Sequence, residues 1–188
     1  METIKQLWQN FENWLSNNTP HLIEALKSGA TNDDIEKAEN NLGVTFPIFF
    51  KEIYQIHNGQ FIDKPGIFPE GTMLPLNEIV RHWEILKQLK DKGHFDGIET
   101  ETPMEIKPIW WSEKWIPIIG DGSGNFLCID FDPTTHGKMG QIIWFEHDIA
   151  ERGIVDISYF NWFDKTIQHI IEDKYYYDQE TDTFEVVD

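Results

Sequence analysis

WIPIIGDGSGNFLCID, the sequence of residues 115–130, decides the fold because it joins two short apolar runs through a turn rich in glycine. The two runs cover residues 115–119 and 126–131, and a third apolar run, 141–145, follows a second polar turn. Short apolar runs between turn-forming residues are typical of strands that are buried inside a sheet. Residues 115–145 are therefore predicted to form antiparallel strands joined by turns.

Helical patterns lie on both sides of these strands. Apolar residues recur at helical spacing, Thr31, Asn77 and Ser158 are suited to cap helix N-termini, and Gly43 is suited to end a helix. A polar turn between the tyrosines at 175–177 and the apolar residues at 184–187 predicts a terminal hairpin. The helices are expected at residues 3–17, 31–42, 47–57, 77–92 and 158–171.

The predicted fold class is α+β, with a mainly antiparallel sheet flanked by helices. We expect one domain over residues 1–188, in which the helix 3–17 and the hairpin 175–187 are extensions. Residues 94–108 have no periodicity and are rich in carboxylates, so they are predicted to form a solvated, mobile excursion.

Composition limits the classes of partner. The chain has 33 Asp and Glu against 15 Lys and Arg, a formal net charge of −18, and a pI near 4.6. Direct binding to nucleic acid or to anionic membranes needs basic clusters, so a basic protein is the favoured partner, although solubility alone also explains an acidic surface. The single cysteine, Cys128, and the lack of a signal peptide or membrane span predict a cytoplasmic location.

Carboxylates near the strand ends offer one enzymatic alternative. Asp121, Asp130, Asp132 and Asp148, with Glu146 nearby, could hold a divalent cation for a hydrolase in which His147 is the general base. Their spacing matches no known metal motif, and the glycine turn is followed by a strand rather than by the helix that a phosphate cradle needs. We therefore predict no catalytic residues, no metal and no cofactor.

Aromatic residues in adjacent positions indicate where a partner protein could bind. Neighbouring side chains on one strand point to opposite faces, so the members of such pairs cannot all enter one core, although a covering helix or loop can also bury them. Together with the strand-end carboxylates, they form the predicted partner-binding set of Trp110, Trp111, Asp121, Asp130, Asp132, Tyr175 and Tyr177.

Two sequence blocks resemble the SUKH superfamily over roughly residues 31–172. The first block is an acidic helix, a Leu-Gly turn before Pro47, and a helix followed by an Asn-Gly pair; the second is residues 115–130, followed by 140–148. Phe46 replaces a more usual leucine, and Phe163 departs mildly from another, but both keep an apolar side chain. The matching motif residues are Gly43, Pro47, Asn58, Gly59, Gly122 and Gly124.

That superfamily includes bacterial immunity proteins of polymorphic toxin systems and a fungal regulator of cell-wall synthesis. The resemblance implies a helix-flanked sheet without catalytic apparatus, and an immunity protein that neutralises a cognate toxin, a basic protein such as a nuclease, by covering it. A regulatory or scaffolding protein is the alternative, and the metal-dependent hydrolase is a weaker one. The resemblance does not identify the partner.

Overall fold

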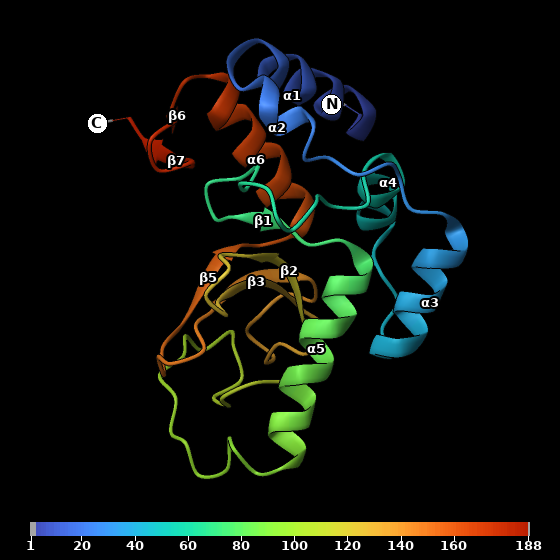
Figure 1. Cartoon of the computed structure of the whole chain (residues 1–188). Coiled ribbons are helices and arrows are strands. Elements are labelled where there is room, and N and C mark those ends of the chain that lie inside the picture. The colour runs from blue at the N-terminus through green and yellow to red at the C-terminus, as the bar shows by residue number, and fades with distance from the viewer. Residues whose placement is uncertain (1–2, 188) are drawn as a thin grey trace.

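The computed structural model describes residues 3–187 and contains one five-stranded sheet, one hairpin and six helices within that range. Figure 1 shows α1, α2, α6 and the hairpin gathered at one end of the molecule, with the sheet and α5 at the other. Residues 1, 2 and 188, the ends of the expected domain, lie outside the described residues. The elements are α1 (Ile4–Asn18), α2 (Pro20–Ile23), α3 (Asn32–Leu42), α4 (Ile48–Ile56), β1 (Thr72–Met73), α5 (Leu76–Asp91), β2 (Trp115–Gly120), β3 (Phe126–Asp130), β4 (Gln141–Phe145), β5 (Arg152–Asp156), α6 (Tyr159–Ile171), β6 (Tyr175–Asp178) and β7 (Thr183–Val186).

The sheet is antiparallel throughout, in the order β1-β2-β3-β4-β5, so the predicted α+β class is confirmed. The three predicted strands are its centre, and they are buried on both faces, which explains their continuous apolar runs. Pro117 lies where the register between β2 and β3 shifts, one of the few places where a strand accepts proline. Cys128, in the middle of β3, is fully buried as predicted, and burial raises the pKa of its thiol.

Local signals fix several helix ends. Thr31 accepts a hydrogen bond from the Asp34 amide and its own amide donates to the Asp34 carboxylate, so the two residues form a capping box at the start of α3. Gly43 ends α3 in the left-handed conformation with φ of 62°. α4 begins one residue later than predicted, because Pro47 takes the N-cap position.

The Asn58-Gly59 pair does not close α4, contrary to the sequence prediction. α4 ends at Ile56, and His57 is already extended. Instead, the Asn58 side-chain oxygen accepts a hydrogen bond from the Leu76 amide at 3.0 Å, at the start of α5. Gly59, with φ of 65°, passes so close to that turn that a Cβ would lie 2.5 Å from the Pro75 nitrogen. The pair therefore joins α4 to α5.

The N-terminal helix packs onto the rest of the chain. The Trp8 ring lies 5.3 Å from the Phe163 ring of α6, and Trp8 is buried. His57 Nε2 contacts the Glu12 carboxylate at 2.6 Å, while its Nδ1 lies 2.8 Å from the Lys27 carbonyl oxygen. α1 is thus integrated into the core through both apolar and polar contacts.

The excursion between α5 and β2, residues 94–114, is largely exposed up to residue 105, as expected of a solvated segment, but its contacts with the sheet contradict the expectation that residues 94–108 are mobile. Ile106 is buried, and the Gln141 side chain donates a hydrogen bond to the Glu105 carbonyl at 3.3 Å. Near the other end, the buried Arg152 donates to the Trp110 carbonyl and lies 4.9 Å from its ring. Side chains of the sheet therefore satisfy backbone groups that a free loop would leave to water.

Candidate partner-binding surfaces

The predicted partner-binding residues do not form one surface. Asp121 is exposed, Trp110, Asp132, Tyr175 and Tyr177 are half-buried, and Trp111 and Asp130 are buried. Tyr175 and Tyr177 lie on the terminal hairpin, and the other five residues lie around the main sheet. The prediction therefore divides into separate regions.

Burial removes Trp111 and Asp130 from any surface that a partner could touch, which corrects the prediction for these two residues. The Trp111 ring packs 6.4 Å from that of Trp83 on α5. The Asp130 carboxylate accepts hydrogen bonds from the Asp132 amide at 2.8 Å and from the Gln141 side chain at 2.9 Å. Burial is the main cause that raises the pKa of Asp130 above its ordinary value. Both residues hold the excursion and the sheet together.

Sheet register separates the carboxylates that the hydrolase alternative would bring together. Gly120 pairs with Phe126, which pairs with Phe145, so Asp121 and Asp148 follow strands at one end of the sheet. Asp130 pairs with Trp115 and Gln141 at the opposite end of the sheet, and Asp132 lies nearby. Along β3, the backbone positions of Phe126 and Asp130 are roughly 13 Å apart at the usual rise per residue. Within residues 3–187 no group of three or more His, Cys, Asp or Glu side chains is placed to hold a metal ion.

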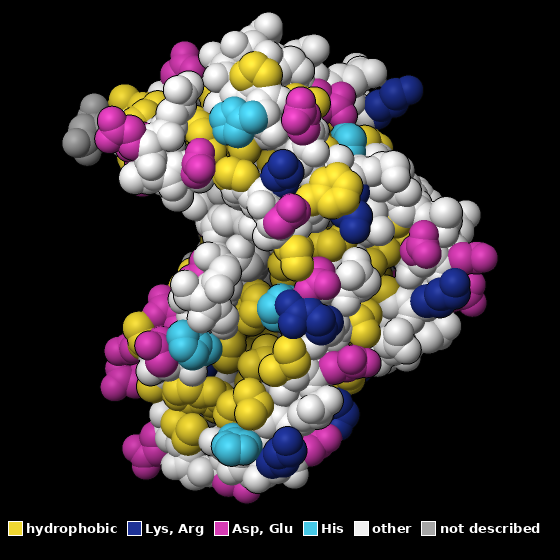
Figure 2. Space-filling model, viewed as in Figure 1, with side chains coloured by type: hydrophobic (Ala, Val, Ile, Leu, Met, Phe, Trp, Pro, Cys, Tyr) yellow, Lys and Arg dark blue, Asp and Glu magenta, His cyan; other side chains and the backbone are white. Residues whose placement is uncertain are grey.

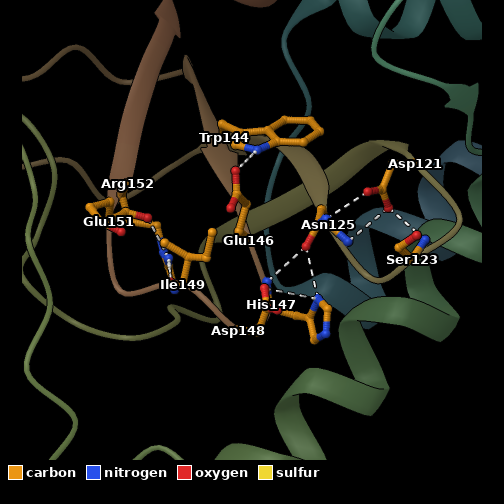
Figure 3. A network of polar contacts seen from close by, with 10 residues as sticks. All are labelled: Asp121, Ser123, Asn125, Trp144, Glu146, His147, Asp148, Ile149, Glu151 and Arg152. Carbon is orange, nitrogen blue, oxygen red and sulfur yellow. Dashed lines mark hydrogen bonds and ion pairs between the residues drawn. The ribbon is translucent and has the colours of Figure 1, made fainter.

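At the exposed end, polar contacts shape the glycine turn, residues 120–125 (Figure 3). Asp121 accepts hydrogen bonds from the Ser123 amide at 2.7 Å and from the Asn125 side chain at 2.7 Å. The Asn125 side-chain oxygen lies 3.0 Å from both the backbone nitrogen and Nδ1 of His147. Asp121 and His147 therefore have structural partners in the turn.

A cleft of about 190 Å³ separates the glycine turn from α5, and we call it the glycine-turn cleft. Its apolar lining includes Leu74 and Phe126, and Ile62 at its edge is 56% exposed. Figure 2 shows apolar side chains interleaved with charged ones over α5 and the middle of this face. The cleft is lined by Ile62, Thr72, Leu74, Glu78, Arg81, His82, Gly120, Gly122, Gly124 and Phe126.

Three side chains of α5 form the polar wall of this cleft. Arg81 donates a hydrogen bond to the Glu78 carboxylate, and its guanidinium lies 3.0 Å from His82 Nε2. The His82 ring lies 4.9 Å from that of Phe126. Burial first, and the Arg81 charge second, lower the pKa of His82 below its ordinary value, against the opposing effect of Glu78. His82 is therefore held neutral at pH 7, with Nε2 as the acceptor.

Sequence reasoning missed this cleft. Ile62 stands in an irregular loop, and Glu78, Arg81 and His82 lie off the apolar stripe of their helix. The adjacent apolar residues Phe61 and Ile62 in that loop, and the glycine turn itself, were the available signals.

The second surface consists of two adjoining hollows beside the terminal hairpin, which together we call the terminal groove. One part, of about 340 Å³, lies between the hairpin and α1, and another, of about 410 Å³, lies beside the end of α6. Asp173, Tyr175 and Val187 line both parts. The remaining lining residues are Trp14, Asn18, Thr19, His169, Lys174, Tyr176, Tyr177 and Val186.

Tyr177 fixes the hairpin next to the groove. Its ring packs 5.2 Å from that of Phe184, and its hydroxyl donates to the Asp182 carboxylate at 3.2 Å. The hydroxyl also lies 3.3 Å from His21 Nε2. Burial, followed by the nearby Asp182 charge, raises the pKa of Tyr177 to about 12. The hairpin is thus held by specific contacts.

Several similar proteins are named as fungal regulators, and they are longer than this chain. A glucan synthesis regulatory protein of Neurospora crassa is 23% identical, over 95% of this chain and 40% of its own length. The cell wall assembly regulator SMI1 of Saccharomyces cerevisiae is 25% identical, over 79% of this chain and 36% of its own. A cell wall biosynthesis/cell cycle regulator smi1 of Schizosaccharomyces pombe is 27% identical, over 83% of this chain and 34% of its own length. The chain therefore spans about a third to two fifths of these relatives.

A family model gives the assignment. The model of the SMI1 / KNR4 family (SUKH-1) matches residues 29–165, which include the glycine-turn cleft and leave out the hairpin. These matches do not extend to the bacterial toxin setting that the resemblance implies. Across residues 3–187, no helix is long and apolar enough to cross a membrane. The helix-flanked sheet and the extent of the match lead to one conclusion: the chain belongs to the SMI1/KNR4 (SUKH-1) family.

Proposed function

We propose that this chain is a non-catalytic, protein-binding regulatory domain whose glycine-turn cleft contacts the protein that it regulates. The observation that carries the proposal is an apolar cleft with a charged wall inside the family-matched part of the chain. Fungal relatives named as regulators support the regulatory role, and the chain corresponds to only part of each of them. The proposal therefore concerns binding by this domain and not a complete regulatory pathway.

The dimensions and chemistry of the cleft favour a protein as its occupant. Small-molecule sites are usually about 300–1,000 Å³ in volume, whereas this cleft has about 190 Å³. Such a volume suits one inserted side chain of a partner, packed against Leu74 and Phe126 and surrounded by the polar groups of Glu78 and Arg81. An apolar anchor inside a polar rim is the usual arrangement of the strongest contacts at protein interfaces.

The test compares two exposed apolar side chains that have the same change. Ile62→Asn alters the edge of the cleft, and Met139→Asn alters a residue that is 68% exposed in the turn at the far end of the sheet. Partners recovered with the wild-type chain from its native host are identified by mass spectrometry, and the affinity of each purified partner for both variants is measured. We expect Ile62→Asn to weaken binding by about tenfold and Met139→Asn to leave it unchanged. Equal affinities of the two variants would exclude the cleft.

Toxin neutralisation is a second candidate because of the surplus of acidic residues. A formal charge of −18 favours fast association with a basic toxin, to which the chain would bind and whose active site it would cover. We expect co-expression with a toxin encoded next to the gene to restore growth. Continued toxicity with every neighbouring toxin would reject this role while leaving the regulatory proposal in place.

The remaining proposals follow from composition. The acidic surplus argues against nucleic acid or an anionic membrane as a direct partner. A lone cysteine fits a reducing compartment such as the cytoplasm. Fractionation of the native host, with antibody detection of the chain, would test the location.

A further inference from the structure

The terminal groove is a second, separate surface. It lies between α1, the end of α6 and the hairpin, at the end of the molecule away from the lower part of α5 (Figure 1). The hairpin residues lie beyond the family match, which ends at residue 165. Because Asp173, Tyr175 and Val187 line both of its parts, an extended segment could contact both parts at once.

Charge defines what the groove can accept. Residues 172–187 carry six Asp or Glu side chains and one lysine. That lysine, Lys174, is already paired with Glu172 at 2.7 Å. The exposed Asp173 carboxylate has no ion pair or side-chain hydrogen bond within the described chain, residues 3–187. The groove therefore offers an exposed carboxylate without an ion partner, at a residue that lines both of its parts.

Aromatic rings add a second feature that favours a cation. Tyr175 is half-buried in the groove, and Tyr176 is 51% exposed on the hairpin. In the part of the chain that the structure describes, lysine or arginine groups lie over the rings of Phe61, Trp110 and Phe145, and not over these tyrosines. A cation from outside could therefore stack on a tyrosine ring while it pairs with Asp173.

We propose that the terminal groove binds an extended, arginine-containing segment of a partner protein. The guanidinium pairs with Asp173 and stacks on Tyr175, and a neighbouring apolar side chain packs on Val186 and Val187. Arginine fits better than lysine because its planar group stacks on aromatic rings, is weakly hydrated, and binds a carboxylate through two hydrogen bonds. This binding requires neither the glycine-turn cleft nor the regulatory function proposed above.

The experiment uses the full chain and a short fluorescein-labelled peptide of Arg-Val-Ser repeats, with anisotropy as the readout. Two matched peptides carry Lys or Glu in place of Arg. Asp173→Asn removes the charge and keeps a residue that tolerates the positive φ of 56° at this position. Asp63→Asn, at an exposed loop residue near the cleft, makes the same charge change elsewhere. Tyr175→Leu removes the ring but keeps an apolar side chain.

We expect the Arg peptide to bind most tightly and the Glu peptide not to bind. Asp173→Asn and Tyr175→Leu should each raise the Kd of the Arg peptide about fivefold or more. Asp63→Asn and Ile62→Asn should leave this Kd unchanged. Amide NMR shifts on titration should map to Asp173, Tyr175 and Val187. Failure of the Arg peptide to bind, equal weakening by the two aspartate variants, or shifts that map elsewhere would overturn the proposal. Normal partner binding through the cleft in the same variants would show that the regulatory function stands independently.

Discussion

Two connections of the sheet, the excursion of residues 94–114 and the glycine turn of residues 120–125, differ in length and in how they are held. The excursion is long and irregular, yet buried side chains of the sheet bind its backbone through Arg152 and Gln141. The turn is short, is held by the exposed Asp121, and leaves an open cleft beside it. In these two connections, anchoring follows the buried polar side chains that contact the loop, and not its length or composition.

The largest expected effect comes from removing Arg152, the buried anchor of the excursion. Its guanidinium donates hydrogen bonds to the carbonyls of Ile149, Glu151 and Trp110, and burial lowers its pKa to about 10. Arg152→Ala should lower the free energy of unfolding by about 3 kcal/mol, because three carbonyls lose a charged donor and the apolar and aromatic contacts of a buried side chain are lost. Urea denaturation measures the loss, and hydrogen exchange should increase across the excursion.

The control for this prediction is Arg81→Ala, which removes an arginine whose side chain is 50% exposed. A surface ion pair contributes about 0–1 kcal/mol, so Arg81→Ala should lower the free energy of unfolding only slightly. Similar losses for the two variants would mean that the anchoring role assigned to Arg152 is wrong.

A somewhat smaller effect is expected from Asp130→Ala at the other anchor. Loss of the carboxylate leaves the Asp132 amide and the Gln141 side chain without their acceptor, and Gln141 in turn holds Glu105. We expect a loss of about 2 kcal/mol in urea denaturation. Asp132→Ala, which removes a half-exposed carboxylate paired with Lys107, should cost less than half as much. The reverse order would exclude Asp130 as an anchor.

The turn should respond less. Asp121→Ala removes the acceptor for the Ser123 and Asn125 groups, but these groups can bind water instead. The expected loss is about 1 kcal/mol in the same assay. Ser123→Ala retains the backbone amide that bonds to Asp121, and should be close to neutral. A loss for Asp121→Ala that equals that for Arg152→Ala would remove the contrast between the two connections.

The smallest effect concerns pH. The pKa of His82 is lowered in the folded state from its ordinary 6.5, so the unfolded chain binds more protons just below that pH. Folding stability should therefore fall slightly as pH drops from 6.5 toward the folded-state pKa, and the effect is small because His82 is only partly buried. In His82→Gln, this part of the pH dependence should disappear. Urea titrations of the two proteins from pH 7 to 5 measure the difference. If stability depends on pH in the same way in His82→Gln and in the wild-type chain, the lowered pKa assigned to His82 is wrong.

Local patterns were enough to predict the parts of the fold that depend on local interactions. The apolar runs of β2, β3 and β4 and the caps of α3 reflect burial and backbone hydrogen bonding within a few residues. β5 was not predicted, because a five-residue strand with charged ends forms through pairing with β4 rather than through its own pattern. The role of Asn58 was also inaccessible, since its partner amide lies 18 residues away.

The candidate sites were harder to predict than the fold. The exposed Asp121 and the buried Asp130 both lie at strand ends, and only the packing of the excursion distinguishes them. The glycine-turn cleft brings together Ile62, His82 and Phe126, which come from three separate segments. Tyr175 and Tyr177 were identified because adjacent aromatic residues on a strand cannot all be buried together, and both line the terminal groove.

The lone thiol of Cys128 has a practical consequence. It lies fully buried at the middle of the sheet, and its raised pKa keeps it in the unreactive protonated form. Alkylation can therefore proceed only when β3 separates from its neighbours or the chain unfolds. With a single cysteine in the sequence, the rate of mass increase in the presence of an alkylating reagent reports the opening of this sheet, without any added label.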